Sequence, residues 1–122
     1  MTIRYTWPVI LWSAIILTVT LIPGKAVPEV DIVNIDKVVH FFIFAVLMVA
    51  TSYAVKKTRD KKGLPTSLLL PGLYSIGLGI SIEFLQRYVP GRSFSVADMI
   101  ANTIGVAIGY FIFKLMVRKN MI

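Results

Sequence analysis

Four stretches of mostly apolar residues, separated by short polar segments, dominate this sequence of 122 residues. Each is close to the length of about 20 helical residues that crosses the hydrocarbon core of a bilayer. The composition agrees, because 57% of the residues are hydrophobic, only 16% are charged and the mean hydropathy is +0.78, outside the balance typical of soluble domains. We therefore expect an all-α polytopic membrane protein, a four-transmembrane-helix bundle that forms a single membrane domain over residues 1–122.

The predicted spans cover residues 7–22, 36–55, 67–88 and 96–117. The first span has Thr6 as a candidate N-cap and Pro8 in its first turn, and Pro23 and Gly24 stop it. A cleaved signal peptide is the alternative, since Arg4 precedes the apolar core. Because Pro-Gly-Lys-Ala stands where a small-residue cleavage site is expected, we expect the span to be retained.

Lysine and arginine are unevenly distributed among the connecting segments. Nine of the 13 lie near the two chain ends or between spans two and three: Arg4, Lys56, Lys57, Arg59, Lys61, Lys62, Lys114, Arg118 and Lys119. The positive-inside rule places these segments in the cytoplasm, which predicts an N-in/C-in topology. The alternative for the connection between spans two and three is a polar turn whose charges are merely solvated.

The net charge of +7 is expected to face anionic membrane lipids, because the cations lie beside the apolar stretches. We expect no binding to nucleic acid. The chain contains no cysteine, which excludes disulfides, thiol catalysis and cysteine-ligated metals.

Polar side chains inside the spans gather near three helix ends that this topology places on the outer side. They are Asp36 and His40 at the start of span two, Glu83 and Gln86 near the end of span three, and Asp98 and Asn102 at the start of span four. Such residues are unfavourable in a membrane and often mark functional sites. Since residues four apart share a helix face, we expect these side chains to converge at a similar depth.

Several of these residues also have a structural explanation. Ser95 and Asp98 fit a capping box at the start of span four. Asn34 is a candidate cap for span two, which puts Asp36 in the first turn, where a negative charge is favourable. His40 could bond Asp36 across one turn.

Glu83 is harder to explain as purely structural, because a carboxylate at that depth must be paired, hydrogen-bonded or protonated. Arg87, one turn further out, is a natural partner. Arg92 follows a turn and could reach back over the site or contact a lipid phosphate.

Small residues at four-residue spacing form packing stripes on the last two spans. Span three has Ser75 and Gly79, and span four has Gly105 and Gly109 on about the same face as Asn102. Small residues allow helices in membranes to approach closely, so we expect spans three and four to touch along these faces. A seam between two copies, giving a homo-oligomer, is the alternative. Span one has no ionisable group and is expected to serve as a packing partner.

The ordered set of polar residues closely resembles the VanZ-like family of small bacterial membrane proteins. The matching positions are residues 36–44, Glu83, Gln86, Pro90, Gly91, Arg92, Asp98, Asn102, Gly105 and Gly109. The namesake of that family is associated with resistance to the glycopeptide antibiotic teicoplanin. The resemblance therefore implies a multi-pass protein of the bacterial cell membrane with a role at the cell envelope, and it implies no settled reaction.

One functional hypothesis is a non-catalytic protein whose outer site binds an amphiphilic ligand. Lipid-linked cell-wall precursors and lipidated glycopeptides are ligands of this kind. Cations and outward helix N-termini favour an anionic headgroup. The candidate ligand-binding residues are Lys37, Gln86, Arg92, Asp98 and Asn102.

The alternative hypothesis is an intramembrane acid/base enzyme acting on a lipid or peptidoglycan-precursor headgroup. Here His40, oriented by Asp36, would be the general base, Glu83 the acid and water the nucleophile. A metal site built from these residues and Asp98 has suitable ligand types but no diagnostic spacing. The sequence therefore assigns no metal and no cofactor.

Overall fold

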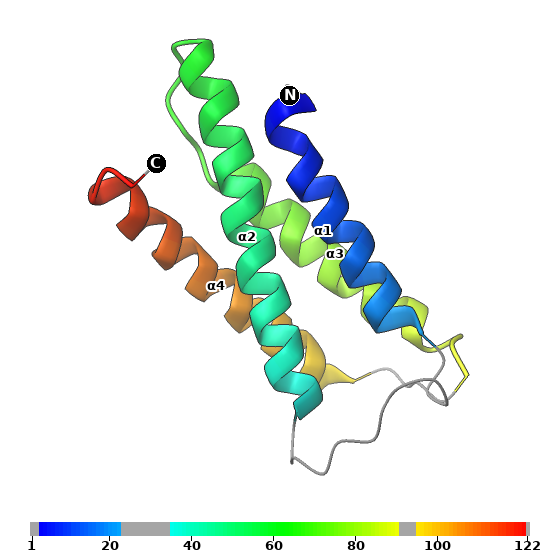
Figure 1. The fold of residues 1–122 in the computed structure, drawn as a ribbon. Coiled ribbons are helices and arrows are strands. Elements are labelled where there is room, and N and C mark those ends of the chain that lie inside the picture. Colours follow the sequence, from blue (N-terminus) through cyan, green and yellow to red (C-terminus); the bar gives the residue numbers. More distant parts are fainter. Residues whose placement is uncertain (1–2, 23–34, 91–94, 122) are drawn as a thin grey trace.

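The computed structural model describes residues 3–22, 35–90 and 95–121, with only the backbone described for Ile3, Ile35 and Asp36. These residues form four α-helices and, within the described ranges, no strand (Figure 1). The helices are α1 (Ile3–Leu21), α2 (Ile35–Lys61), α3 (Leu69–Gln86) and α4 (Val96–Arg118). Each is long and apolar enough to cross a membrane. The predicted all-α architecture with four candidate membrane spans is confirmed.

The helix ends differ from the predicted span ends where polar residues continue a helix. Because α1 begins at Ile3, Thr6 is not its N-cap, and Pro8 lies inside the helix. The second helix continues past Val55 to Lys61, because hydropathy marks the edge of the hydrocarbon and not the end of a helix. Lysine and arginine are good helix formers.

Two contacts stabilise and then end this polar extension of α2. The Lys56 ammonium lies 2.7 Å from the Asp60 carboxylate, one turn further along the helix. After the last turn, Gly63 adopts a φ of +66°, a left-handed conformation that glycine accepts readily and that commonly terminates helices.

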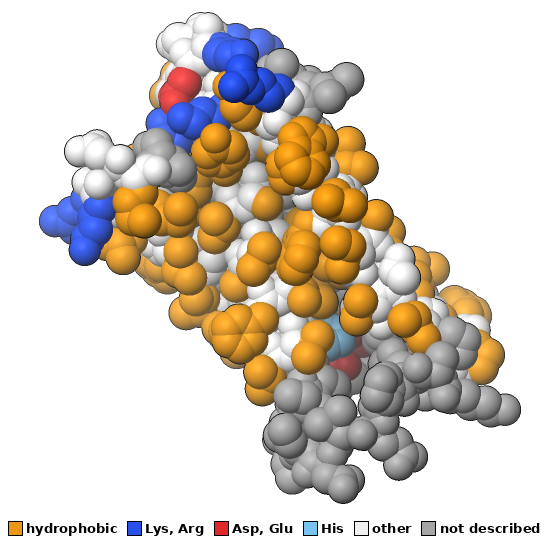
Figure 2. Space-filling view, viewed as in Figure 1, with side chains coloured by type: hydrophobic (Ala, Val, Ile, Leu, Met, Phe, Trp, Pro, Cys, Tyr) orange, Lys and Arg blue, Asp and Glu red, His pale blue; other side chains and the backbone are white. Residues whose placement is uncertain are grey.

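The helices alternate in direction, so the polar segments gather at two opposite ends of the bundle. Figure 1 shows the start of α1, the α2–α3 connection and the end of α4 at one end, which we call the basic end. Figure 2 shows lysine and arginine there together with an acidic side chain, further acidic and histidine side chains near the opposite end, and a band of hydrophobic side chains between the two ends. This distribution is typical of a membrane-spanning bundle.

The glycines of α4 seat that helix directly on α2. A Cβ atom on Gly109 would lie 2.6 Å from the carbonyl oxygen of Ala45 and 2.8 Å from Cβ of Met48. A Cβ atom on Gly105 would collide with the carbonyl oxygen of Phe41. The prediction that these glycines face span three was wrong, because a small-residue motif indicates close approach without identifying the neighbour.

Helix α3 lies against both members of this pair. The Ser75 hydroxyl is 4.0 Å from Sδ of Met48 in α2. A Cβ on Gly79 would lie 3.2 Å from Cε1 of Phe44 and 3.3 Å from Nδ2 of Asn102. The small residues of α3 therefore pack inside the bundle, and spans three and four touch at Gly79 and Asn102, as expected.

Helix α1 serves as a packing partner, as expected. The indole N–H of Trp12 donates to the carbonyl oxygen of Ile43 in α2 at 2.9 Å. The hydroxyls of Ser13 and Tyr74 in α3 share a hydrogen bond of 2.7 Å. The buried core cluster comprises Ile16, Phe44, Leu47, Met48, Ile82 and Val106.

Candidate functional site

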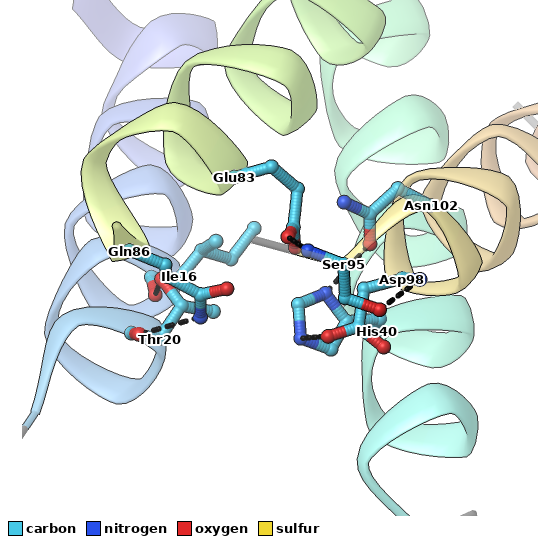
Figure 3. A network of polar contacts seen from close by, with 8 residues as sticks. All are labelled: Ile16, Thr20, His40, Glu83, Gln86, Ser95, Asp98 and Asn102. Carbon is cyan, nitrogen blue, oxygen red and sulfur yellow. Dashed lines mark hydrogen bonds and ion pairs between the residues drawn. The ribbon is translucent and has the colours of Figure 1, made fainter. Parts of the chain in front are cut away.

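Three helices bring four polar side chains together inside the bundle, near the end opposite the basic end. We call them the buried polar cluster: His40 of α2, Glu83 of α3, and Asp98 and Asn102 of α4 (Figure 3). All four are buried, and Glu83 has no exposed surface. The sequence predicted that polar side chains from these three helices converge, and the structure shows this convergence for these four residues.

His40 directs both of its ring nitrogens at α4. Its Nδ1 lies 2.8 Å from Oδ1 of Asn102, and its Nε2 lies 3.7 Å from Oδ2 of Asp98. Since the amide oxygen of Asn102 can only accept, Nδ1 carries the hydrogen. Asp36 on the same helix was one candidate partner for His40; the two contacts described for the ring come from α4, and the Asp36 side chain lies outside the described residues.

The start of α4 is a capping box in which Glu83 takes the acidic position. Ser95 is the N-cap, and its hydroxyl accepts from the backbone N–H of Asp98 at 3.2 Å. The backbone N–H of Ser95 donates to Oε2 of Glu83 at 3.1 Å. In an ordinary capping box the acidic residue of the same helix accepts that N–H. Because Glu83 of α3 does so here, the Asp98 carboxylate lies beside His40.

Gln86 lies apart from the buried polar cluster, although the sequence grouped them. Its Nε2 donates to the carbonyl oxygen of Thr20 at 2.8 Å, on the α1 side of the site (Figure 3). That carbonyl is in the last turn of α1 and has no partner in its own helix. Gln86 therefore links the ends of α1 and α3. Arg92 lies outside the described residues, and the Arg87 guanidinium lies over the Phe84 ring at 5.9 Å.

A groove between α2 and α4 runs beside the buried polar cluster, with a volume of about 420 Å³. Its lining comprises Lys37, Val38, Phe41, Phe42, Ala101 and Ile104. Lys37 is one turn before His40, and Ala101 is one turn after Asp98, so the groove and the cluster are adjacent on both helices. We call this feature the α2–α4 groove. The sequence indicated Lys37 but not the apolar residues that line the groove. Their spacing of three or four residues along each helix is the signal that could have identified them.

The buried polar cluster also contains a set of groups able to hold a metal ion. His40, Glu83 and Asp98 each offer one ligand atom, and these three atoms lie within 4.8 Å of one another. They come from three different helices, so no sequence spacing could have indicated the set.

Comparisons with known proteins agree with the pattern of polar residues. A family described as VanZ/LLP1 matches residues 3–117. An uncharacterised protein of Schizosaccharomyces pombe is 29% identical over 73 residues, which are 60% of this chain and 43% of that protein. The chain thus spans less than half of that relative's length. No solved structure matches significantly. Because the family match covers nearly the whole chain, the chain belongs to the VanZ/LLP1 family.

Proposed function

We propose that this membrane protein binds an amphiphile with an anionic headgroup in the α2–α4 groove. The observation that carries the proposal is the combination of an apolar lining with a single cation, Lys37, beside the buried polar cluster. An acyl or prenyl chain would lie against Phe41, Phe42 and Ile104. The headgroup would lie at Lys37, near the start of α2.

The helix ends at this site favour a negative headgroup. Helices α2 and α4 both begin there, and a helix N-terminus carries a partial positive charge. Arg87, at the end of α3, adds a further cation at the same end. Asp98 lies in the first turn of α4, but its carboxylate is directed inward at His40.

The distribution of lysine and arginine supports an N-in/C-in orientation, with the basic end in the cytoplasm. In a bacterial cell membrane the groove would then open to the outer leaflet. Lipid-linked cell-wall precursors and lipidated glycopeptides combine a chain and a polar headgroup as this groove requires. A contribution to teicoplanin-type resistance is part of this proposal, and binding of a lipidated glycopeptide at the outer leaflet would account for it.

The test is a binding titration of the detergent-purified chain with phosphatidic acid, and with phosphatidylcholine as the zwitterionic comparison. Lys37→Gln should weaken phosphatidic acid binding about fivefold, since one lysine near a membrane surface contributes about 1 kcal/mol. Lys119→Gln, the same charge change at the exposed end of α4, is the matched control. Equal affinities for Lys37→Gln, Lys119→Gln and the unmodified chain would contradict the proposal.

The second candidate function is an acid/base enzyme, favoured by the contacts of His40. Asn102 fixes the ring so that Nε2 faces away from it and towards Asp98. Water would attack a headgroup ester, His40 would take the proton from the water, and Glu83 in its acid form would protonate the leaving oxygen. Turnover of a headgroup-labelled lipid that disappears in both His40→Ala and Glu83→Gln is the expected result. No turnover across a panel of anionic lipids would refute this candidate.

A further inference from the structure

We infer that His40, Glu83 and Asp98 form a binding site for a divalent first-row metal ion such as Zn²⁺. The inference goes beyond amphiphile binding and does not depend on it, because these three side chains lie inside the bundle and the α2–α4 groove lies beside them. Four features of the buried polar cluster support it: spacing, the orientation of His40, charge and ligand type.

The spacing of the three side chains suits a shared ion. Their ligand atoms lie within 4.8 Å of one another, and the 3.7 Å between Nε2 of His40 and Oδ2 of Asp98 is too long for a hydrogen bond. Zinc binds nitrogen and oxygen at about 2.0–2.2 Å, so two ligands of a tetrahedral site lie about 3.3–3.6 Å apart. Small side-chain rotations would close all three onto one ion.

The orientation of His40 points to the same conclusion. Asn102 Oδ1 accepts from Nδ1, so in a neutral ring Nε2 presents a lone pair, and the group that faces it is a carboxylate. Two acceptors that face each other need a proton or a metal cation between them. Metal-binding histidines usually donate their other N–H to an oxygen acceptor, which fixes the tautomer. Asn102 has this position and role.

A second polar atom in the cluster is aimed at the same region. Asn102 is 3% exposed, and its Nδ2 has no hydrogen-bond partner among the described residues. In Figure 3 this amide nitrogen points towards the side chain of Glu83. A water or anion bound to the metal ion would give Nδ2 an acceptor.

Charge and burial favour a divalent ion over a monovalent one. Glu83 is fully buried, and Asp98 is 7% exposed. Carboxylates taken out of water need charge compensation, and buried charges in proteins are paired or bind metals. A divalent cation offsets the charge of two carboxylates, whereas a proton on His40 offsets one.

The ligand types define the class of metal. One imidazole and two carboxylates suit borderline ions such as Zn²⁺, Co²⁺ and Mn²⁺, and the chain has no cysteine to select a softer metal. Three protein ligands leave a coordination position open, as in catalytic zinc sites. That position could hold water or an oxygen of an anionic headgroup.

The experiment is a titration of the detergent-purified chain with Zn²⁺ and Co²⁺, after treatment with a chelator and without added lipid. We expect a single ion per chain and a visible Co²⁺ spectrum typical of bound, low-symmetry cobalt. Both His40→Ala and Asp98→Asn should weaken binding at least about 100-fold, and Asn102→Ala about 10–100-fold, the range for residues that orient a ligand.

The matched control is Asp60→Asn, which removes an exposed carboxylate at the basic end. It should bind Zn²⁺ as the unmodified chain does, and circular dichroism checks that each variant retains its helices. The inference is overturned if the unmodified chain binds no ion. That result does not depend on the folding of any variant. It is also overturned if Asp60→Asn weakens binding as much as Asp98→Asn. Either result leaves the Lys37-dependent lipid titration, performed with a chelator present, unaffected.

Discussion

Glu83 in α3 accepts the backbone N–H of Ser95, the N-cap residue of α4, over 3.1 Å. One hydrogen bond thereby joins two helices that are separated along the chain by residues 87–95. The same hydrogen bond also affects which contacts are open to the Asp98 carboxylate. With the N–H of Ser95 already bonded to Glu83, the Asp98 carboxylate can lie beside His40.

The first prediction concerns the acceptor in this bond. Glu83→Leu leaves a partly buried N–H without its partner and should lower the free energy of unfolding by about 2 kcal/mol. Glu83→Gln keeps an amide oxygen at the same position and should lose less. Thermal unfolding in detergent, followed by circular dichroism with a chelator present, compares the two. If both variants unfold at the same temperature, the bond to Ser95 does not stabilise the start of α4.

The second prediction concerns the cap itself. Ser95→Ala removes the hydroxyl that accepts from the N–H of Asp98 and should lower stability by about 1 kcal/mol. Ser81→Ala is the control, since Ser81 is exposed and its hydroxyl donates to the carbonyl oxygen of Gly77 in its own helix. The change at Ser81 should stay within about 0.5 kcal/mol. Losses of the same size at both positions would argue against a capping role.

The third prediction uses the contrast between two glycines. Gly109→Ala places a methyl group 2.6 Å from the carbonyl oxygen of Ala45 and should cost about 1–3 kcal/mol by overpacking. Gly77 in α3 has nothing within 4 Å of the same added atom. There, alanine should stabilise the helix by about 0.5–1 kcal/mol. The two substitutions should therefore shift the unfolding temperature in opposite directions.

Unfolding temperatures that shift equally, or in the reversed directions, would contradict the close contact between α4 and α2. If Gly109→Ala were neutral, α4 would not sit on α2 as closely as the structure has it. If Gly109→Ala changed only the oligomeric state in detergent, the glycine stripe would be a seam between copies, as the alternative interpretation of the sequence holds.

The sequence predicted the number of helices and the gathering of polar residues well, because both follow from long-range averages. Hydropathy over about 20 residues identifies a span. An even number of spans places both chain ends and the connection between spans two and three, where most of the cations lie, on one side. That His40, Glu83 and Asp98 lie at the same end of the bundle follows from chain direction alone. These inferences need no knowledge of which helices touch.

The details that were missed depend on which helices are neighbours. The glycines of α4 could equally have met α2 or α3, and only the three-dimensional order of helices places Gly109 against Ala45. Spacing paired His40 with Asp36 and Ser95 with Asp98. In the structure, Glu83 of another helix accepts the backbone N–H of Ser95, and the described contacts of His40 come from Asn102 and Asp98 of α4. Local spacing shows what a side chain can reach, and packing decides what it contacts.

The last prediction tests the direction in which the bundle crosses the membrane. The chain has no cysteine, so a single introduced thiol reports its own side. Lys62→Cys lies after the end of α2, at the basic end, and Tyr88→Cys lies after α3, at the opposite end; both positions are exposed. If the topology is N-in/C-in, a membrane-impermeant maleimide added to intact cells should label Tyr88→Cys and leave Lys62→Cys unlabelled until the cells are opened. The reverse pattern would place the buried polar cluster and the α2–α4 groove on the cytoplasmic side, and would remove the basis for binding ligands from the outer leaflet.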